Sequence, residues 1–353
     1  MSAAAMDALW TSEEALAATG GRCSACFQAT GITIDSRVTS PGDMFVAIKG
    51  PNFDGHDFVA DAMMEGAAAA VTHHIPIGVS GGVPVLIVDD TLKALEKMGA
   101  FARGRGHARI VAITGSLGKT GVKEALKTVL GEQGPASANE DSLNNHWGLP
   151  LSLARMPANS AYGVFEIGMN HPGEIEPLSR LARPHVALIT NVEAAHIAFF
   201  GSLGEIADAK AEIFAGIEAG GTAVLNRDNS FFDHLAAKAK SKGVKRIIGF
   251  GADGQADARV KEFTAEADGS LIEALIDGVP VKYRVAIPGR HWVMNSLAVL
   301  GAVLALEGDV EAAAEGLSRV EASKGRGLRQ NVRILDGGFQ LIDESYNASP
   351  VSM

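Results

Sequence analysis

The sequence predicts an α/β protein: a small N-terminal α/β domain, then a central domain whose mostly parallel sheet is flanked by helices. Three observations support this fold class. Short apolar runs typical of buried strands alternate with helical segments over most of the chain. A glycine-rich loop joins one such strand to a helix near residue 115. A final pair of strand-like segments begins a third unit, so we place domains at 1–105, 106–325 and 326–353.

Length and composition fit this organisation. The chain has 353 residues, of which 47% are hydrophobic and 20% charged, as in an ordinary globular protein of two or three domains. The net charge of −10 argues against non-specific binding of nucleic acid. The longest charge-free span, 66–88, is interrupted by His73, His74 and Pro76, so we expect no membrane insertion.

The only two cysteines, Cys23 and Cys26, form the sequence CSAC. A structural zinc site needs four ligands, and neither a second cysteine pair nor a nearby histidine pair completes one. We therefore expect reduced thiols in a cytoplasmic protein. The N-terminus has early acidic residues and no basic region before an apolar core, which is unlike a secretory signal.

The N-terminal domain is predicted from two strands and two helices. DMFVAIKG and VPVLIVDD read as buried strands, and DFVADAMMEG and TLKALEKMGAFARG read as helices. The basic, glycine-containing segment RGRGHAR, 103–109, is a suitable linker to the next domain.

The central domain begins with the strand RIVAIT, the glycine-rich loop and a helix. Four further strands, YGVFEIG, HVALIT, GTAVLN and KRIIGF, alternate with helices such as EIEPLSRLA, LGEIADAKAEIFAGIE and NSFFDHLAAKAK. This alternation is typical of a parallel sheet covered on both faces. Residues 258–286 read as an antiparallel patch, and MNSLAVLGAVLALEG as a helix.

The last segment, VRILDGGFQLIDESYNASPVSM, opens a hairpin and stops at Met353 without a following helix. We expect a chain that lacks most of its third domain.

The loop after RIVAIT predicts a phosphate site. The full phosphate-loop pattern would place a glycine at position 113, where this chain has isoleucine. Gly115-Ser116-Leu117-Gly118-Lys119-Thr120 remains, between a buried strand and a helix. Backbone N–H groups at a helix N-terminus attract polyphosphates, Lys119 can reach the terminal phosphates, and Thr120 offers a hydroxyl to magnesium. A glycine turn that merely precedes lysine is the alternative.

Several motifs together resemble one family. T-G-S-x-G-K-T is similar to the loop of the Mur ligases and of folylpolyglutamate synthetases. NNHWGLPLSL, FEIGMNHPGEI, ITNVEAAHIAFFGS, KAEIF, IPGRHWVMNS and DESYNASP follow in the order expected of that family. IDSRVTSPGDMFVAIKGPNFDGHDF resembles the nucleotide-sugar-binding domain of the muramoyl ligases that add the third residue or the final dipeptide. The asparagine pair and the DESYNASPVSM ending favour the dipeptide-adding branch, and the resemblance covers essentially the whole chain.

The resemblance implies an ATP-dependent amide ligase of peptidoglycan precursor synthesis. Its substrates would be UDP-N-acetylmuramoyl-tripeptide and D-alanyl-D-alanine, joined through an acyl phosphate with ADP as a product. Because two anions must approach one another, the reaction needs concentrated positive charge, which Lys119 and two magnesium ions would supply. A monomer with a Rossmann-like third domain is implied. Most of the dipeptide site would lie in that domain, so we expect no turnover by this chain alone.

The resemblance also assigns individual residues. The catalytic and metal-binding set would be Lys119, Thr120, Glu166, His196 and Lys210, with Lys210 as a carbamate that behaves like a carboxylate. The ATP set would be Thr114, Gly115, Ser116, Leu117, Gly118, Lys119, Thr120, Asn295, Arg326 and Asp343. The sugar-peptide set would be Ser36, Arg37, Lys49, Asn144 and Asn145.

Alternatives remain for these residues. Arg37 could belong to a solvated surface pair with Asp35, and Lys210 could be an exposed helix lysine. Trp292 stands where the family usually has asparagine, and Ser349 departs from its usual N-A-N-P ending.

Two alternative functions also remain. A folate polyglutamylating ligase would share the loop and the lysine but has no reason for the DSR segment. A non-catalytic nucleotide-binding protein would need no second metal, and Glu166, His196 and Lys210 together argue against it.

Overall fold

The computed structural model describes residues 8–75, 83–140, 143–194, 200–322, 325–335, 337–343 and 345–346. The chain divides into two compact units. The first comprises Met1–Ala108 and Ser142–Ser160, and the second comprises Arg109–Asp141 and Ala161–Met353. Residues 142–160, predicted to belong to the central domain, pack with the N-terminal unit in the structure.

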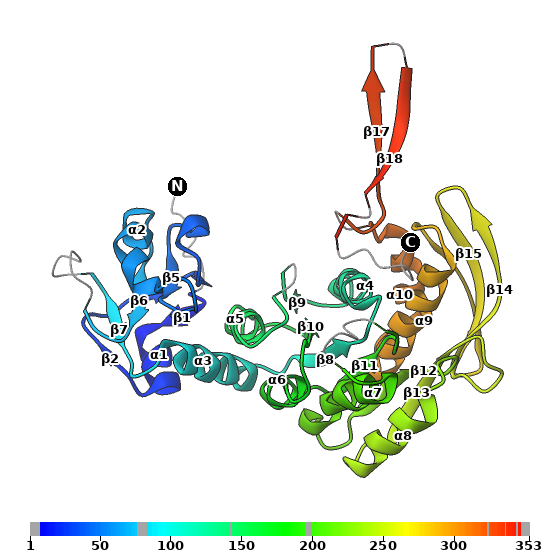
Figure 1. Cartoon of the computed structure of the whole chain (residues 1–353), viewed down its shortest axis with the longest axis horizontal. Coiled ribbons are helices and arrows are strands. Elements are labelled where there is room, and N and C mark those ends of the chain that lie inside the picture. The colour runs from blue at the N-terminus through cyan, green and yellow to red at the C-terminus, as the bar shows by residue number, and fades with distance from the viewer. Residues whose placement is uncertain are drawn as a thin grey trace. The chain divides into compact units, whose positions relative to one another are not determined.

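The N-terminal unit is built on a sheet in the order β2-β7-β6-β5-β4 (Figure 1). Strands β4 to β7 are parallel, and β2 is antiparallel to β7. The bounds are β2 Arg22–Cys23, β4 Gly31–Thr33, β5 Asp43–Val46, β6 Ala69–Thr72 and β7 Val85–Ile87; β1 Trp10–Thr11 pairs with β3 Gln28–Ala29. The helices are α1 Ser12–Thr19, α2 Val59–Met64, α3 Thr91–Arg105 and α5 Gly148–Ala154, with 3-10 turns η1 Ser36–Val38 and η2 Gly55–Phe58.

Both faces of this sheet are buried, as expected for parallel strands. Alternate residues of β5 enter different apolar clusters: Met44 and Val46 face one, and Phe45 faces the other. Helix α3 presents Leu95 and Met98 to the first cluster at helical spacing. Helix α5 joins the same cluster, and the Trp10 indole N–H donates to the Ala154 carbonyl at 2.8 Å. The apolar packing of α5 and this bond place residues 142–160 in the first unit.

The second unit is built on a longer sheet in the order β16-β15-β14-β13-β12-β11-β8-β10-β9. The strands are β8 Arg109–Thr114, β9 Ala136–Ala138, β10 Tyr162–Glu166, β11 Val186–Ile189, β12 Thr222–Asn226, β13 Arg246–Gly251, β14 Ala258–Glu266, β15 Gly269–Ile276 and β16 Val279–Val285. All neighbours from β9 through β14 are parallel, and β14–β15–β16 is antiparallel. The predicted parallel sheet with its antiparallel patch is confirmed.

Helices cover both faces of this sheet. Helices α4, α9 and α10 pack together on one face, while α6 contacts β8 and α8 contacts β12 on the other. The bounds are α4 Lys119–Gly131, α6 Ile175–Ala182, α7 Leu203–Ala211, α8 Phe232–Ser241, α9 Arg290–Ala305 and α10 Val310–Gly316, with 3-10 turns η4 Glu212–Gly216 and η5 Leu317–Arg319. In the part of the chain described, no helix combines the length and apolarity needed to cross a membrane.

The parallel pairing brings three strand ends together at one edge of the sheet. Glu166, the last residue of β10, pairs with Ile113 of β8, and Ile189 of β11 pairs with Thr114. Strand β8 is also the point where the topology reverses, because the chain continues to β9 and β10 on one side and to β11 on the other. Ligands of open α/β sheets bind at such a point, beyond the carboxyl ends of the strands.

The predicted C-terminal hairpin is also present. Strands β17 Leu328–Ile334 and β18 Gly337–Asp343 form an antiparallel pair that projects from the second unit (Figure 1). Phe339, Leu341 and Ile342 are exposed on it.

Candidate functional site

The phosphate loop follows β8 and ends at the N-terminus of α4. Gly115 has φ +151, and a Cβ there would overlap the Thr190 hydroxyl. Gly118 has φ +83, in the left-handed region, and a Cβ there would lie 2.8 Å from Asn295 Oδ1. Both positions therefore require glycine, and Asn295 of α9 lies beside the loop. Its contact with an adenine stays a prediction.

The segment after β11 holds the loop in shape. The Ser116 N–H donates to the Asn191 carbonyl at 2.9 Å, and the Ser116 hydroxyl donates to the Glu193 carbonyl at 2.9 Å. The Thr190 hydroxyl donates to the Leu117 carbonyl. These bonds tie the loop to residues 190–193, which follow β11.

Lys119 lies at the first position of α4. Its ammonium donates to the Gly115 carbonyl at 2.9 Å, closing the loop on itself. Burial lowers the pKa of Lys119 below the usual lysine value, the carboxylate of Glu166 acts in the opposite direction, and the charge of Arg326 adds to the lowering. The linker arginine is thus electrostatically close to the loop lysine.

Glu166 carries a buried carboxylate at the end of β10, only 2% exposed. The Thr120 hydroxyl donates to Glu166 Oε2 at 2.8 Å, so the loop threonine and the strand-end acid are in direct contact. The peptide group of Glu166 is held by Asn139: the Glu166 N–H donates to Asn139 Oδ1 at 2.9 Å, and Asn139 Nδ2 donates to the Glu166 carbonyl at 3.0 Å.

Lys210 is a buried lysine near the end of α7, 2% exposed. Burial holds its pKa well below the usual lysine range, and the positive charge of Lys119 contributes in the same direction. The alternative of an exposed helix lysine is therefore wrong. His196, predicted as a further metal ligand, lies outside the described residues.

Two further predicted ATP residues, Arg326 and Asp343, have local partners, and so does Trp292 at the family's asparagine position. Trp292 is buried, and a Cβ on Gly121 would meet its ring at 3.2 Å, so it packs on α4 one turn from Asn295. The Arg326 guanidinium lies over the Tyr346 ring at 4.5 Å. Asp343 accepts the Gly325 N–H at 3.0 Å and thereby shapes the linker turn.

The predicted sugar-peptide residues lie in the N-terminal unit. Arg37 forms two hydrogen bonds to Asp35, at 2.9 and 2.6 Å, and its side chain is 85% exposed, which is the surface pair considered above. Lys49 Nζ lies 3.6 Å from Asp54 Oδ2. Asn145 Oδ1 accepts the Gly148 N–H at 2.9 Å at the start of α5.

Ser36 and Asn144 complete that set. Ser36 starts the 3-10 turn η1, adjoining Asp35, and Asn144 directly precedes the asparagine that binds α5. Their roles toward a ligand stay predictions.

Comparison with known proteins identifies the family. The chain matches the Mur ligase middle domain over residues 113–303 and the catalytic domain of the Mur ligase family over residues 28–102. It belongs to the Mur ligase family. The predicted family resemblance is confirmed.

Named relatives of this Mur ligase agree on one activity in their names. UDP-N-acetylmuramoyl-tripeptide–D-alanyl-D-alanine ligase of Rickettsia prowazekii is 32% identical, over 98% of this chain and 76% of the relative. The enzyme of that name from Escherichia coli is 36% identical, over 91% of this chain and 70% of the relative.

Solved structures agree with this family assignment. A crystal structure of MurF from Acinetobacter baumannii matches with a TM-score of 0.84 at 31% identity, covering 97% of this chain and 74% of that one. MurF ligase from Thermotoga maritima, in complex with ADP, matches with a TM-score of 0.75 at 26% identity, covering 91% and 72%. A folylpolyglutamate synthetase from L. casei matches with a TM-score of 0.55 at 14% identity, covering 69% of each chain, which shows a shared fold alone.

The donor set of this Mur ligase fits a magnesium nucleotide. Among the described residues, no group of three or more His, Cys, Asp or Glu side chains is placed to hold a metal by itself. Mg²⁺ usually takes one or two protein carboxylates and completes its shell with waters and phosphate oxygens. The touching oxygens of Thr120 and Glu166, beside the phosphate loop, satisfy that requirement.

Sequence reasoning missed Lys123, Asn139 and Glu212. Lys123 donates to the Asn139 carbonyl, and the Asn139 side chain bonds to the Glu166 backbone. Glu212 accepts N–H groups at the start of α6. Only Glu212 had a local signal, since it belongs to the quoted KAEIF segment; the other two depend on contacts distant in sequence.

Proposed function

We propose that this chain acts as a UDP-N-acetylmuramoyl-tripeptide–D-alanyl-D-alanine ligase in peptidoglycan precursor synthesis. The observation that carries the proposal is the contact between Thr120 and Glu166 at the sheet edge, beside Lys119, whose charge acts on both Glu166 and buried Lys210. The agreement of relatives over most of the chain supports it. The ligase class follows from the names those relatives carry.

ATP is the proposed phosphoryl donor. The loop N–H groups and Lys119 would bind the phosphates, Asn295 would contact the adenine, and Arg326 and Asp343 would approach the phosphates and ribose. Support comes from the position of Asn295 against Gly118, from the electrostatic effect of Arg326 on Lys119, and from the ADP bound in the Thermotoga relative. Two magnesium ions, with Thr120, Glu166, His196 and Lys210 as their protein ligands, would supply positive charge to the phosphate oxygens.

The proposed reaction activates the terminal carboxylate of the tripeptide. Transfer of the γ-phosphoryl group gives an acyl phosphate and ADP, and the amine of D-alanyl-D-alanine then forms the amide as phosphate leaves. Lys119 would lower the repulsion between the substrate carboxylate and the triphosphate, because it would place a positive charge beside the phosphates. Ser36, Arg37, Lys49, Asn144 and Asn145 would hold the UDP-sugar-peptide, with the planar fork of Arg37 suited to a phosphate.

A carbamate on Lys210 belongs to the same proposal. A lysine with a lowered pKa has more neutral amine, which is the form that reacts with carbon dioxide. The product carries a negative charge beside Lys119 and replaces a like-charge contact with an attractive one. A monomer in the cytoplasm completes the proposal, and the free thiols of Cys23 and Cys26 suit that compartment.

Ligand binding tests the substrate assignment, because it does not depend on turnover. Calorimetry with UDP-N-acetylmuramoyl-tripeptide, with UDP alone and with a folate polyglutamate should give tight binding of the first, weaker binding of the second and no binding of the third. Binding of the folate without the UDP-sugar would overturn the proposal in favour of a folate ligase. In the complete mixture with ATP, Mg²⁺ and D-alanyl-D-alanine, a product with the mass of the amide would exclude a non-catalytic binding protein.

A further inference from the structure

A closed ring of hydrogen bonds connects α4 to the end of β10. Its first half is the hydrogen bond that the Thr120 hydroxyl donates to the Glu166 carboxylate. The second half runs from the Glu166 peptide to the Asn139 side chain, and from the Asn139 carbonyl to the Lys123 ammonium at 2.7 Å. Thr120 and Lys123 lie three residues apart on α4, so one face of the helix makes both ends of the ring.

Asn139 extends the sheet by one rung with its side chain. The β9–β10 ladder pairs Ala138 with Val164, and β9 ends there. The Asn139 amide then makes both a donor and an acceptor bond with the Glu166 peptide, as a backbone peptide of a neighbouring strand would. The backbone of Glu166, the last residue of β10, is therefore hydrogen-bonded on the side of β9 although β9 itself has ended.

Lys123 is an expensive residue at this position. Its side chain is completely buried, and its ammonium lies 2.7 Å from Glu124, whose side chain is 33% exposed. Burying an ammonium costs more than burying an apolar side chain of similar length, even when the charge is paired. A methionine would fill the same volume, so packing alone does not account for a lysine here.

We propose that Lys123 and Asn139 are positioning residues that fix the Glu166 carboxylate relative to Thr120, and so set the affinity of the site for the divalent cation of the nucleotide. The inference rests on the proposed function, in which Thr120 and Glu166 hold that cation. Residues that orient metal ligands commonly change metal affinity by about 10–100-fold when substituted.

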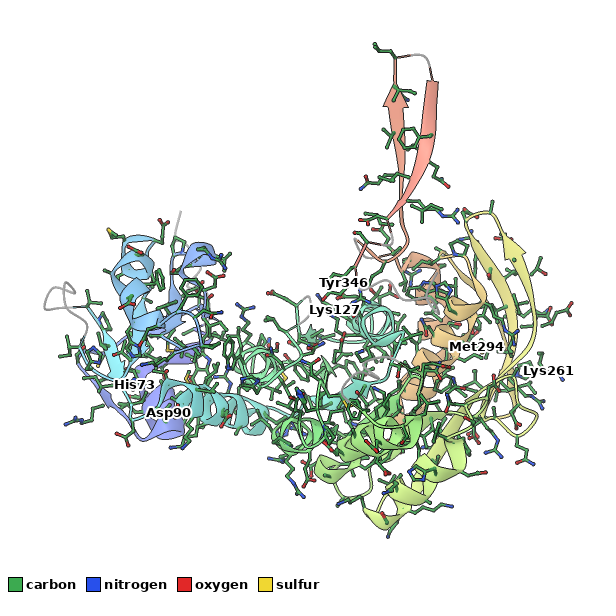
Figure 2. The ribbon with its side chains drawn as sticks, viewed as in Figure 1. His73, Asp90, Lys127, Lys261, Met294 and Tyr346 are labelled. Carbon is green, nitrogen blue, oxygen red and sulfur yellow. The ribbon has the colours of Figure 1, made fainter. Side chains whose placement is uncertain are left out.

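The test measures Mn²⁺ binding to the 353-residue chain with ADP, by electron paramagnetic resonance of the free ion. Lys123→Met removes the ammonium while keeping the volume. Asn139→Asp keeps the shape and the acceptor for the Glu166 N–H but turns a carboxylate oxygen toward the Glu166 carbonyl. Lys127→Met is the matched control, because Lys127 is an exposed lysine one turn further along α4 (Figure 2). We expect the Mn²⁺ dissociation constant to rise at least about tenfold in the first two variants and to change less than about twofold in the control.

ADP affinity without metal separates positioning from general damage. It should stay within about twofold of the parent chain in all three variants, because the loop N–H groups and Lys119 are untouched. Unchanged Mn²⁺ affinity in folded Lys123→Met and Asn139→Asp would overturn the inference while leaving the proposed function intact. If the parent chain itself binds no Mn²⁺ with ADP, the nucleotide part of the proposed function fails instead. If both variants unfold, or if metal-free ADP binding falls as much as Mn²⁺ binding, the ring is structural and the inference is wrong.

Discussion

The backbone conformation at Gly118 restricts which residue can occupy this position of the phosphate loop. It has φ +83, and Asn295 occupies the space that a side chain would need. We predict that Gly118→Ala lowers the free energy of unfolding by about 1–2 kcal/mol, since a left-handed conformation is costly for residues with a Cβ. The same change should weaken ADP binding, because it moves both the loop and Asn295.

Gly131 at the end of α4 provides the matched control for this prediction. A Cβ there meets nothing within 4 Å, and its φ is not in the left-handed region. Gly131→Ala should leave ADP affinity unchanged and leave stability equal or raised by about 0.4–1 kcal/mol. Urea unfolding and calorimetry with ADP provide both numbers, and similar losses in the two variants would contradict the prediction.

We predict that Lys210 forms a carbamate. In ¹³C-bicarbonate, the chain should show one slow-exchanging carbamate carbon signal that Lys210→Ala removes. Carbamate formation is favoured because burial and the nearby charge of Lys119 keep the Lys210 amine neutral. Lys240→Ala, which changes an exposed lysine of α8, should keep the signal. A signal that survives in Lys210→Ala would place the carbamate elsewhere.

Site residues could be predicted from the sequence where their neighbours in the chain form a recognisable motif. Lys119 and Thr120 follow a glycine loop, and Glu166 ends an apolar strand where an unpaired carboxylate would be costly. Asn139 and Lys123 were not predictable, because their role depends on hydrogen bonds between residues 16 and 27 positions apart. A lysine in a helix normally reads as exposed, and only its partners distinguish a buried one.

At the scale of elements, Glu212 caps a helix from a distance. Its carboxylate accepts the N–H groups of Gly173, Ile175 and Glu176 at 2.7–3.2 Å, at the N-terminus of α6. We predict that Glu212→Ala lowers the free energy of unfolding by about 1–2 kcal/mol, because it leaves N–H groups of the first turn without this acceptor. Thermal or urea unfolding measures the loss. Glu311→Ala, an exposed acid of α10, should change stability by less than about 0.5 kcal/mol.

His73 makes a similar contact at the start of α3 (Figure 2). Its Nε2 accepts the Thr91 N–H at 3.2 Å, which requires the unprotonated nitrogen. Burial lowers the pKa of His73 from 6.5, and the stacked ring of His56 at 4.6 Å adds to the lowering. Asp90 and Asp54 act in the opposite direction, and His74 contributes a further small lowering.

The lowered pKa fixes the sign of a pH effect. The unfolded chain takes up a proton at His73 near pH 6.5, before the folded chain does, so the stabilising contribution is present above that pH and is lost as the pH falls below it. We predict a steeper loss of stability between pH 7 and pH 5 in the parent chain than in His73→Gln, which does not titrate. His107→Gln, at an exposed histidine, should retain the parent slope. Identical slopes in the parent and His73→Gln would refute this prediction.

Strands and long helices were predictable from their apolar periodicity, and each one predicted is present. The short elements β9 and α5 were not assigned. Strand β9 has three residues, and α5 has seven residues with the apolar sequence GLPLSLA, which has no polar face to reveal its period. Both became recognisable only through their partners, β10 for the strand and Trp10 for the helix.

At the scale of the whole molecule, the two units should respond to different ligands. We predict that UDP-N-acetylmuramoyl-tripeptide slows amide exchange at Ser36–Val38 and around Lys49, in the first unit. ADP with Mg²⁺ should instead slow exchange at residues 115–120 in the second unit. Hydrogen exchange followed by mass spectrometry reads both regions in one experiment. Protection of the phosphate loop by the UDP-sugar alone would contradict the division of binding sites.

The course of the chain through its two units affects how the protein can be divided for study. The backbone leaves the first unit after Ala108, returns for Ser142–Ser160 and leaves again. A fragment that ends at Ala108 would lack Leu151 and Ala154 of α5. It would therefore have an unfilled cavity beside Trp10 in its apolar core. The complementary fragment, which begins after Ala108, would contain α5 without the apolar cluster of the first unit that buries it. A self-standing N-terminal module therefore calls for splicing residues 142–160 back on through a designed linker.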